Sequence, residues 1–252
     1  MALDNRTYLY RASQAGAASV DAGLRAYMLR VYNYMASGVA LTGIIAWVVA
    51  FVPAVHDMFF AVDQRGHSIP GALTWVAIIG SFGIAIGFRF AIASIRASTA
   101  QAMFWAFAAL MGIWLAPIFE IYTGASIARV FLITAGAFAG LSLYGYTTTR
   151  SLSGLGSFLV MGLWGIILAS LVSFFLPTQT QVALNWVISC VSVLVFAGLT
   201  AWDTQKIKEM YWVADDGEVA AKKSIIGALE LYLDFINLFI TLLRFFGEAN
   251  RR

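Results

Sequence analysis

Five polar residues in the last hydrophobic segment, 227–247, are the part of this sequence best suited to chemistry. They are Glu230, Asp234, Asn237, Thr241 and Arg244. Their spacing of four, three, four and three residues places them in one stripe along a helix. A charged side chain near a bilayer centre costs roughly 2.5 to 3.5 kcal/mol on insertion scales. The three charged members of the stripe must therefore face protein, water or an ion rather than lipid.

A second acid, Asp203, lies at the end of the preceding hydrophobic segment, five residues before Lys208. The two segments are consecutive and antiparallel, so Asp203 and Asp234 could approach each other. Asp234 lies about 16 Å beyond Lys223 at helical rise, whereas Asp203 lies only about 8 Å from Lys208. The two acids therefore meet only if the last helix begins outside the membrane, around residues 222–226.

Two carboxylates in contact at a low-dielectric site do not both ionise easily, and such a pair titrates as a unit. A pair formed by Asp203 and Asp234 would therefore be a pH sensor. Calcium prefers about six to eight oxygen ligands, and the ionised pair, with Glu230 and Asn237, could supply several. Protons and calcium would then compete for one transient site. The alternative interpretation is that the stripe only joins helices, with Asp234 paired to an arginine.

Two arginines are candidate partners for these acids. Arg244 lies about 15 Å beyond Asp234 along the same helix, so the two side chains cannot pair directly. Arg89, at the end of the second hydrophobic segment, is nearer to the expected position of Asp203. We therefore consider Arg89 as a latch on Asp203; the alternative is that it anchors the chain at the membrane surface.

Enzymatic classes find little support in the sequence. Two histidines and the single cysteine, Cys190, provide no zinc-type ligand set. The serines inside hydrophobic segments have no histidine partner, so a serine nucleophile lacks its base. Only aspartyl intramembrane proteolysis remains open, because two acids on adjacent helices are its minimum. We expect no enzyme activity, no catalytic residue and no cofactor.

The formal net charge of +3 does not favour nucleic acid as a partner.

The elements that position these residues are membrane-spanning helices. The chain has 252 residues, of which 61% are hydrophobic and 12% charged, and its mean hydropathy is +0.81. Because a span needs about 20 mostly apolar residues, this composition predicts an all-α integral membrane protein with seven spans. The predicted spans are 32–53, 72–90, 101–119, 127–147, 156–176, 183–203 and 225–246.

The predicted organisation has three parts: an N-terminal tail, 1–30, a transmembrane domain, 31–247, and a C-terminal tail, 248–252. An amphipathic stretch in the first tail is expected to lie at the membrane surface; its apolar residues are Leu24, Tyr27, Met28 and Val31. Lysines and arginines gather on the side of the N-terminus, which predicts a cytoplasmic N-terminus. The side of the C-terminus stays open. The expected location is a bacterial inner membrane, with a mitochondrial membrane as the alternative.

Three sequence motifs resemble a known family. They are Trp202-Asp-Thr-Gln-Lys-Ile-Lys208, then Ala228-Leu-Glu-Leu-Tyr-Leu-Asp-Phe-Ile-Asn-Leu-Phe-Ile240, and Leu243-Arg-Phe-Phe-Gly247. Together they are similar to the signature of the Bax inhibitor family, the transmembrane Bax inhibitor motif proteins. The segments Thr134-Ala-Gly-Ala-Phe138 and Ser142-Leu-Tyr-Gly-Tyr-Thr-Thr148 resemble the fourth span of bacterial members. The resemblance covers about residues 25 to 247.

The resemblance implies a seven-helix bundle with a central last helix, and a pH-sensitive calcium leak controlled by an aspartate pair. By motif, that pair is Asp203 and Asp234. The arginine latch of the family falls nearest Arg89, and Arg244 matches the arginine of the closing motif. The acid that partners this second arginine in relatives has no counterpart here, because residues 72–88 contain no Asp or Glu.

Three functional hypotheses follow. The leading one is a calcium leak channel gated by protonation of Asp203 and Asp234. A calcium/proton exchanger would use the same residues. The third is a modulator of a membrane protease that transports nothing and acts through its N-terminal tail or the 204–224 connection. The expected partners are therefore the lipid bilayer, calcium ions and protons, with a membrane protease under the third hypothesis.

Overall fold

The computed structural model describes residues 2–63, 68–173 and 175–250. Within this part of the chain, seven helices are long and apolar enough to cross a membrane. They are α1 (Ala2–Phe51), α3 (Ala72–Ala91), α4 (Ala97–Leu115), α6 (Gly124–Thr147), α7 (Ser153–Ser173), α8 (Thr178–Glu209) and α9 (Gly217–Phe246). Short elements connect them: α2 (Pro53–Phe59), α5 (Ile118–Ile121) and the antiparallel strands β1 (Phe60–Val62) and β2 (Ser68–Pro70). The all-α fold and the seven predicted spans are thus confirmed.

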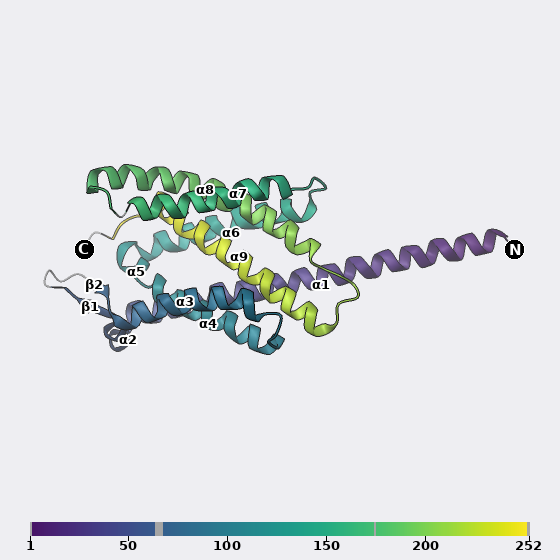
Figure 1. Ribbon diagram of the computed structural model, residues 1–252, viewed down its shortest axis with the longest axis horizontal. Coiled ribbons are helices and arrows are strands. Elements are labelled where there is room, and N and C mark those ends of the chain that lie inside the picture. The colour runs from purple at the N-terminus through teal and green to yellow at the C-terminus, as the bar shows by residue number, and fades with distance from the viewer. Residues whose placement is uncertain (1, 64–67, 174, 251–252) are drawn as a thin grey trace.

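The long helices form two layers with α9 between them (Figure 1). One layer contains α1, α3 and α4, and the other contains α6, α7 and α8. Helix α9 packs against α1 and α4 on one side and against α6 and α8 on the other. Helices α3 and α7 lie at the outside, against α4 and α8 respectively. The expected central position of the last helix is therefore confirmed.

Burial explains why α9 can carry polar residues. In its most apolar stretch 67% of the residues are buried, against 11% to 39% in the other six long helices. Tyr232 is fully buried at its centre, with its ring edge-on to Phe104 and Phe107 of α4. Its hydroxyl shares a hydrogen bond of 2.7 Å with Thr42 of α1. Protein, rather than lipid, surrounds this helix and can satisfy its polar groups.

The connections divide the bundle into two ends. The basic end comprises the connections 92–96, 148–152 and 210–216 and the basic residues next to them. The opposite end comprises residues 52–63, 68–71, 116–123, 175–177 and 247–250. Helix α9 is continuous over 30 residues, and beyond it Thr123 and Glu248 join through a backbone hydrogen bond of 3.0 Å. The chain therefore leaves α9 at the opposite end, which the sequence left open.

The N-terminal region differs from its prediction. Helix α1 runs without a break from Ala2, and its N-terminal part projects from the bundle (Figure 1). Tyr27, Met28 and Val31, expected at the membrane surface, are buried in the core, and Leu24 packs against it. One reason is that Tyr27 meets the ring of Tyr211 from the α8–α9 connection, at 5.6 Å between ring centres. An amphipathic helix buries its apolar face against whichever apolar surface is available, here protein.

Candidate functional site

Two glycines allow α8 to approach its neighbours closely beside Asp203. A Cβ atom on Gly145 of α6 would overlap the backbone carbonyl of Ala201. A Cβ atom on Gly156 of α7 would overlap the indole ring of Trp202. Small residues at such crossings let helix backbones pack tightly within a membrane. The segment of α8 that contains Ala201 and Trp202 is thereby held against α6 and α7, directly before Asp203.

Hydrogen bonds fix the end of α8 to the α6–α7 connection. The side chain of Gln205 accepts from the backbone N–H of Leu152 at 2.7 Å and donates to the carbonyl of Arg150 at 2.9 Å. Lys208 donates to the carbonyl of Tyr146 at 2.8 Å. Helix ends leave backbone groups unsatisfied, and these side chains satisfy several of them. The last turns of α8 therefore have one defined position.

Helix α9 starts early enough to bring its acid to Asp203. Its N-cap is Asp216, whose carboxylate accepts from the backbone N–H of Val219 at 2.7 Å. The helix begins at Gly217, earlier than the predicted start around residues 222–226. Asp203 and Asp234 are 8% and 5% exposed. Their carboxyl groups lie close enough to interact directly with each other. A carboxylate only accepts hydrogen bonds, so a hydrogen bond between the two groups forms only when one of them carries a proton.

Lys206 supplies the positive charge of the site. Its ammonium group lies 2.7 Å from Glu230 Oε1 and 3.5 Å from Asp203 Oδ1. It therefore bridges α8 and α9 next to the aspartate pair. The sequence analysis did not assign this role to Lys206. The signal was present, because Lys206 follows Asp203 by three residues, a spacing at which opposite charges meet on a helix.

Three buried oxygens of this site lack hydrogen-bond partners among the described residues. They are Glu230 Oε2, Asp234 Oδ2 and the hydroxyl of Tyr27. Tyr27 lies close enough to Glu230 to interact with it electrostatically. Buried polar atoms nearly always have partners, and exceptions often mark a function or a missing ion or water. The arrangement can therefore take up a cation or water between α1, α8 and α9.

The other candidate residues lie away from the pair. Asn237 donates to the carbonyl of Leu233 in its own helix, at 2.8 Å, and Thr241 donates to the carbonyl of Asn237, at 2.7 Å. Arg244 is exposed at the opposite end. Arg89 is also exposed, on the outer helix α3, and no ion pair among the described residues includes it. The structure thus does not bring Arg89 to Asp203; Lys206 lies there instead.

A resident metal centre is not formed by these residues. In the described ranges, no group of three or more His, Cys, Asp or Glu side chains could hold a metal ion. One reason is that Lys206 draws Glu230 Oε1 to itself.

Comparison with known proteins finds close relatives over nearly the whole chain. The family model described as Inhibitor of apoptosis-promoting Bax1 matches residues 24–251. The uncharacterized protein RP147 of Rickettsia prowazekii is 46% identical over 232 residues, which cover 92% of each chain. The inner membrane protein YbhL of Escherichia coli is 46% identical over 92% of this chain and 94% of its own. The uncharacterized protein YrjE of Lactococcus lactis is 35% identical over 90% and 92%.

Proposed function

The chain belongs to the Bax inhibitor family, and on that premise we propose that it is a calcium leak channel whose conductance follows the protonation of Asp203 and Asp234. The observation that carries this proposal is the contact between two buried carboxyl groups inside a bundle of apolar helices. Ionisable groups inside a membrane protein commonly belong to ion pathways and proton relays. An inner-membrane address is proposed because YbhL carries that description.

Protonation of the acids changes the net charge of the site and therefore its affinity for calcium. Asp203, Asp234 and Glu230 are three carboxyl groups facing one ammonium group, that of Lys206. When all three are ionised, the site carries excess negative charge and attracts a divalent cation. A proton shared by the two aspartates removes part of this charge, and a neutral carboxyl group is a poorer ligand. Acidification should therefore raise the calcium concentration needed for half-maximal flux.

Lys206 acts in this proposal as a tethered cation that occupies the acids when no calcium is present. Its contact with Glu230 at 2.7 Å is short, whereas its contact with Asp203 at 3.5 Å is long. The side chain is only partly buried, so it can move toward solvent at the basic end. Calcium would enter by displacing the ammonium group, which frees oxygens of Glu230 and Asp203.

Calcium uptake into proteoliposomes, measured between roughly pH 6 and pH 8, tests the proposal. Wild type, Asp203→Asn, Asp234→Asn and the matched control Asp57→Asn, an exposed aspartate near the opposite end, are compared. We expect wild type and Asp57→Asn to lose apparent calcium affinity as pH falls, and the two pair variants to respond to pH no longer. Unchanged pH dependence in both pair variants would refute the aspartate gate.

The same vesicles distinguish a channel from an exchanger. A proton ionophore is added to collapse any pH gradient while the calcium gradient is kept. A channel continues to pass calcium down its gradient, because no proton moves in return. An exchanger requires coupled proton movement, and an imposed pH gradient drives its calcium uptake. Uptake driven by a pH gradient alone would replace the channel with the exchanger.

A further inference from the structure

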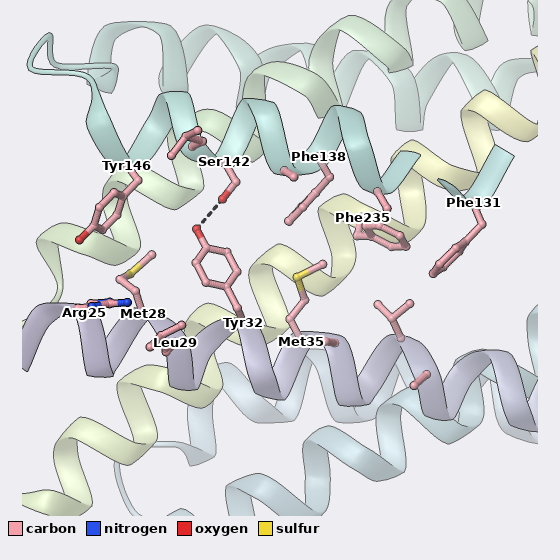
Figure 2. A pocket seen from close by; sticks show the side chains of 16 residues that line it. Arg25, Met28, Leu29, Tyr32, Met35, Phe131, Phe138, Ser142, Tyr146 and Phe235 are labelled. Carbon is pink, nitrogen blue, oxygen red and sulfur yellow. Dashed lines mark hydrogen bonds between the residues drawn. The ribbon is translucent and has the colours of Figure 1, made fainter. Parts of the chain in front are cut away.

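A groove of about 680 Å³ lies between α1 and α6 (Figure 2). Helix α1 packs against α4 and α9, whereas α6 packs against α8 and α9. Both helices thus contact α9, and the groove lies between them. Phe235 of α9 lies between the two helices. The volume falls within the range of roughly 300 to 1,000 Å³ that is usual for small-ligand pockets. The groove is wide enough for a ligand rather than for water alone.

The body of the groove is apolar. Met28 and Met35 line it from α1, and Phe131 and Phe138 line it from α6 (Figure 2). The polar groups on its wall are bonded to protein: Tyr32 and Ser142 share a hydrogen bond of 2.6 Å, and Ser142 and Thr204 share one of 2.9 Å. Methionine side chains are flexible and adapt to irregular apolar partners. This lining suits a hydrocarbon chain and offers little to a hydrated ion.

The length of the groove matches one leaflet of a bilayer. Its lining along α1 extends from Arg25 to Ala40, which corresponds to about 22 Å at helical rise. A complete bilayer measures about 40 to 45 Å with its headgroup regions, so one leaflet accounts for about half of this. Along α6 the lining runs from Tyr146, near the basic end, back to Phe131. A groove of this length that starts at the basic end matches the depth of one leaflet.

Among the described residues, the only positively charged one that lines the groove lies at the basic end of the bundle. Arg25 lines that end, is exposed, and forms no ion pair with any side chain that the structure describes. Tyr146 lies across from it on α6 (Figure 2). The ammonium group of Lys208 lies 5.3 Å from the centre of the Tyr146 ring. Basic residues at this depth attract anionic lipid headgroups.

We propose that this groove binds one anionic phospholipid from the leaflet at the basic end. One acyl chain lies between α1 and α6 against Phe235, and the phosphate group lies beside Arg25. The hydroxyl of Tyr146 provides a donor at the same level. Charge complementarity and the one-leaflet length identify the occupant as a lipid rather than as a helix of another protein.

Photo-crosslinking of the full-length chain tests where the lipid lies. The protein is reconstituted in vesicles of phosphatidylglycerol and phosphatidylcholine that contain a phosphatidylglycerol with a diazirine in its acyl chain. We expect the adducts to concentrate on the groove sides of α1 and α6. Helix α7 is the internal control, because it is the most lipid-exposed long helix, with only 11% of its most apolar stretch buried. Labelling of α7 equal to that of the groove would overturn the proposal, since it indicates bulk lipid only.

Two pairs of variants test the groove and its charge separately. In each variant, native mass spectrometry measures the phospholipid that stays bound after detergent extraction. Ala139→Phe fills the groove, whereas Ala137→Phe changes an exposed residue of the same helix outside it. Only Ala139→Phe should lose the retained phospholipid. Arg25→Gln should lower the preference for phosphatidylglycerol about fivefold, the effect of one basic residue near an anionic surface, while Arg30→Gln leaves it unchanged. Equal retention within both pairs would refute the site.

Discussion

The polar stripe of α9 has an acidic half and a closing half, and the side chains of the two halves have different kinds of partner. In the acidic half, residues 230–234, Glu230 and Asp234 meet Asp203 and Lys206 of α8. In the closing half, residues 237–244, Asn237 and Thr241 donate to carbonyls of their own helix. Arg244 at its end is exposed. Only the acidic half leaves buried oxygens without partners in the described structure.

The difference shows that helical spacing places polar residues on one face of a helix but does not determine which partners they bind. A hydroxyl or amide can bond to the carbonyl four residues earlier, so it needs no second helix. A carboxylate has no donor of its own and must find one elsewhere. The acidic half therefore depends on α8 and its lysine, while the closing half is satisfied within α9. The proposed gate therefore lies in the acidic half.

The largest expected effect comes from removing either acid of the pair. In the proposed gate the two carboxyl groups titrate as a unit, so Asp203→Asn, Asp234→Asn and the double variant should each abolish the pH response to the same extent. The pH dependence of calcium uptake into proteoliposomes measures this. Asn237→Leu, one turn further along α9, is the control and should keep the response of wild type. An additive loss in the double variant would mean that the aspartates act separately.

Disturbing the packing that holds Asp203 should have the next largest effect. Gly145→Ala would place a methyl group against the carbonyl of Ala201, and such overpacking typically costs about 1 to 3 kcal/mol. Thermal unfolding in detergent should show a lower midpoint. Gly140→Ala on the same helix has open space around its Cβ and should leave the midpoint unchanged. Equal midpoints for the two variants would argue against a close α6–α8 contact.

Removing the tethered cation should have a smaller effect in the opposite direction. Lys206→Met should raise apparent calcium affinity about fivefold, corresponding to ~1 kcal/mol for a partly exposed ion pair. Calcium titration of the uptake rate measures it. Lys223→Met removes another lysine of the basic end, paired with Asp215 at 2.6 Å, and should have no effect on affinity. A lower affinity in Lys206→Met would mean that the lysine helps calcium to bind.

The smallest effect is expected in the closing half. Thr241→Val removes a hydroxyl that bonds only within α9, so unfolding free energy should change by about 0.6 kcal/mol or less. Arg244→Gln changes an exposed side chain and should stay within about 0.5 kcal/mol. Neither variant should alter calcium uptake or its pH dependence. A change in uptake for Arg244→Gln would extend the functional site along the whole stripe.

Much of the fold was predictable because it follows from local patterns. Length and hydropathy gave seven spans, and helical spacing placed Asp234 on a face that had to be buried. The approach of Asp203 to Asp234 was predicted on the condition that the last helix begins around residues 222–226; α9 begins earlier, at Gly217. The partner of the acids was missed. Arg89 was considered instead of Lys206, because it ends the second span on the side where Asp203 was expected.

The sequence by itself determined which segments span the membrane and which face of each helix is polar, because hydrophobicity and periodicity are properties of neighbouring residues. Tertiary structure alone decided which helices meet. It buried Tyr27 beside Glu230, left Arg89 exposed on an outer helix, and opened the groove between α1 and α6. These outcomes depend on close contacts such as Gly145 against Ala201, and packing between distant segments leaves no periodic signal in the sequence.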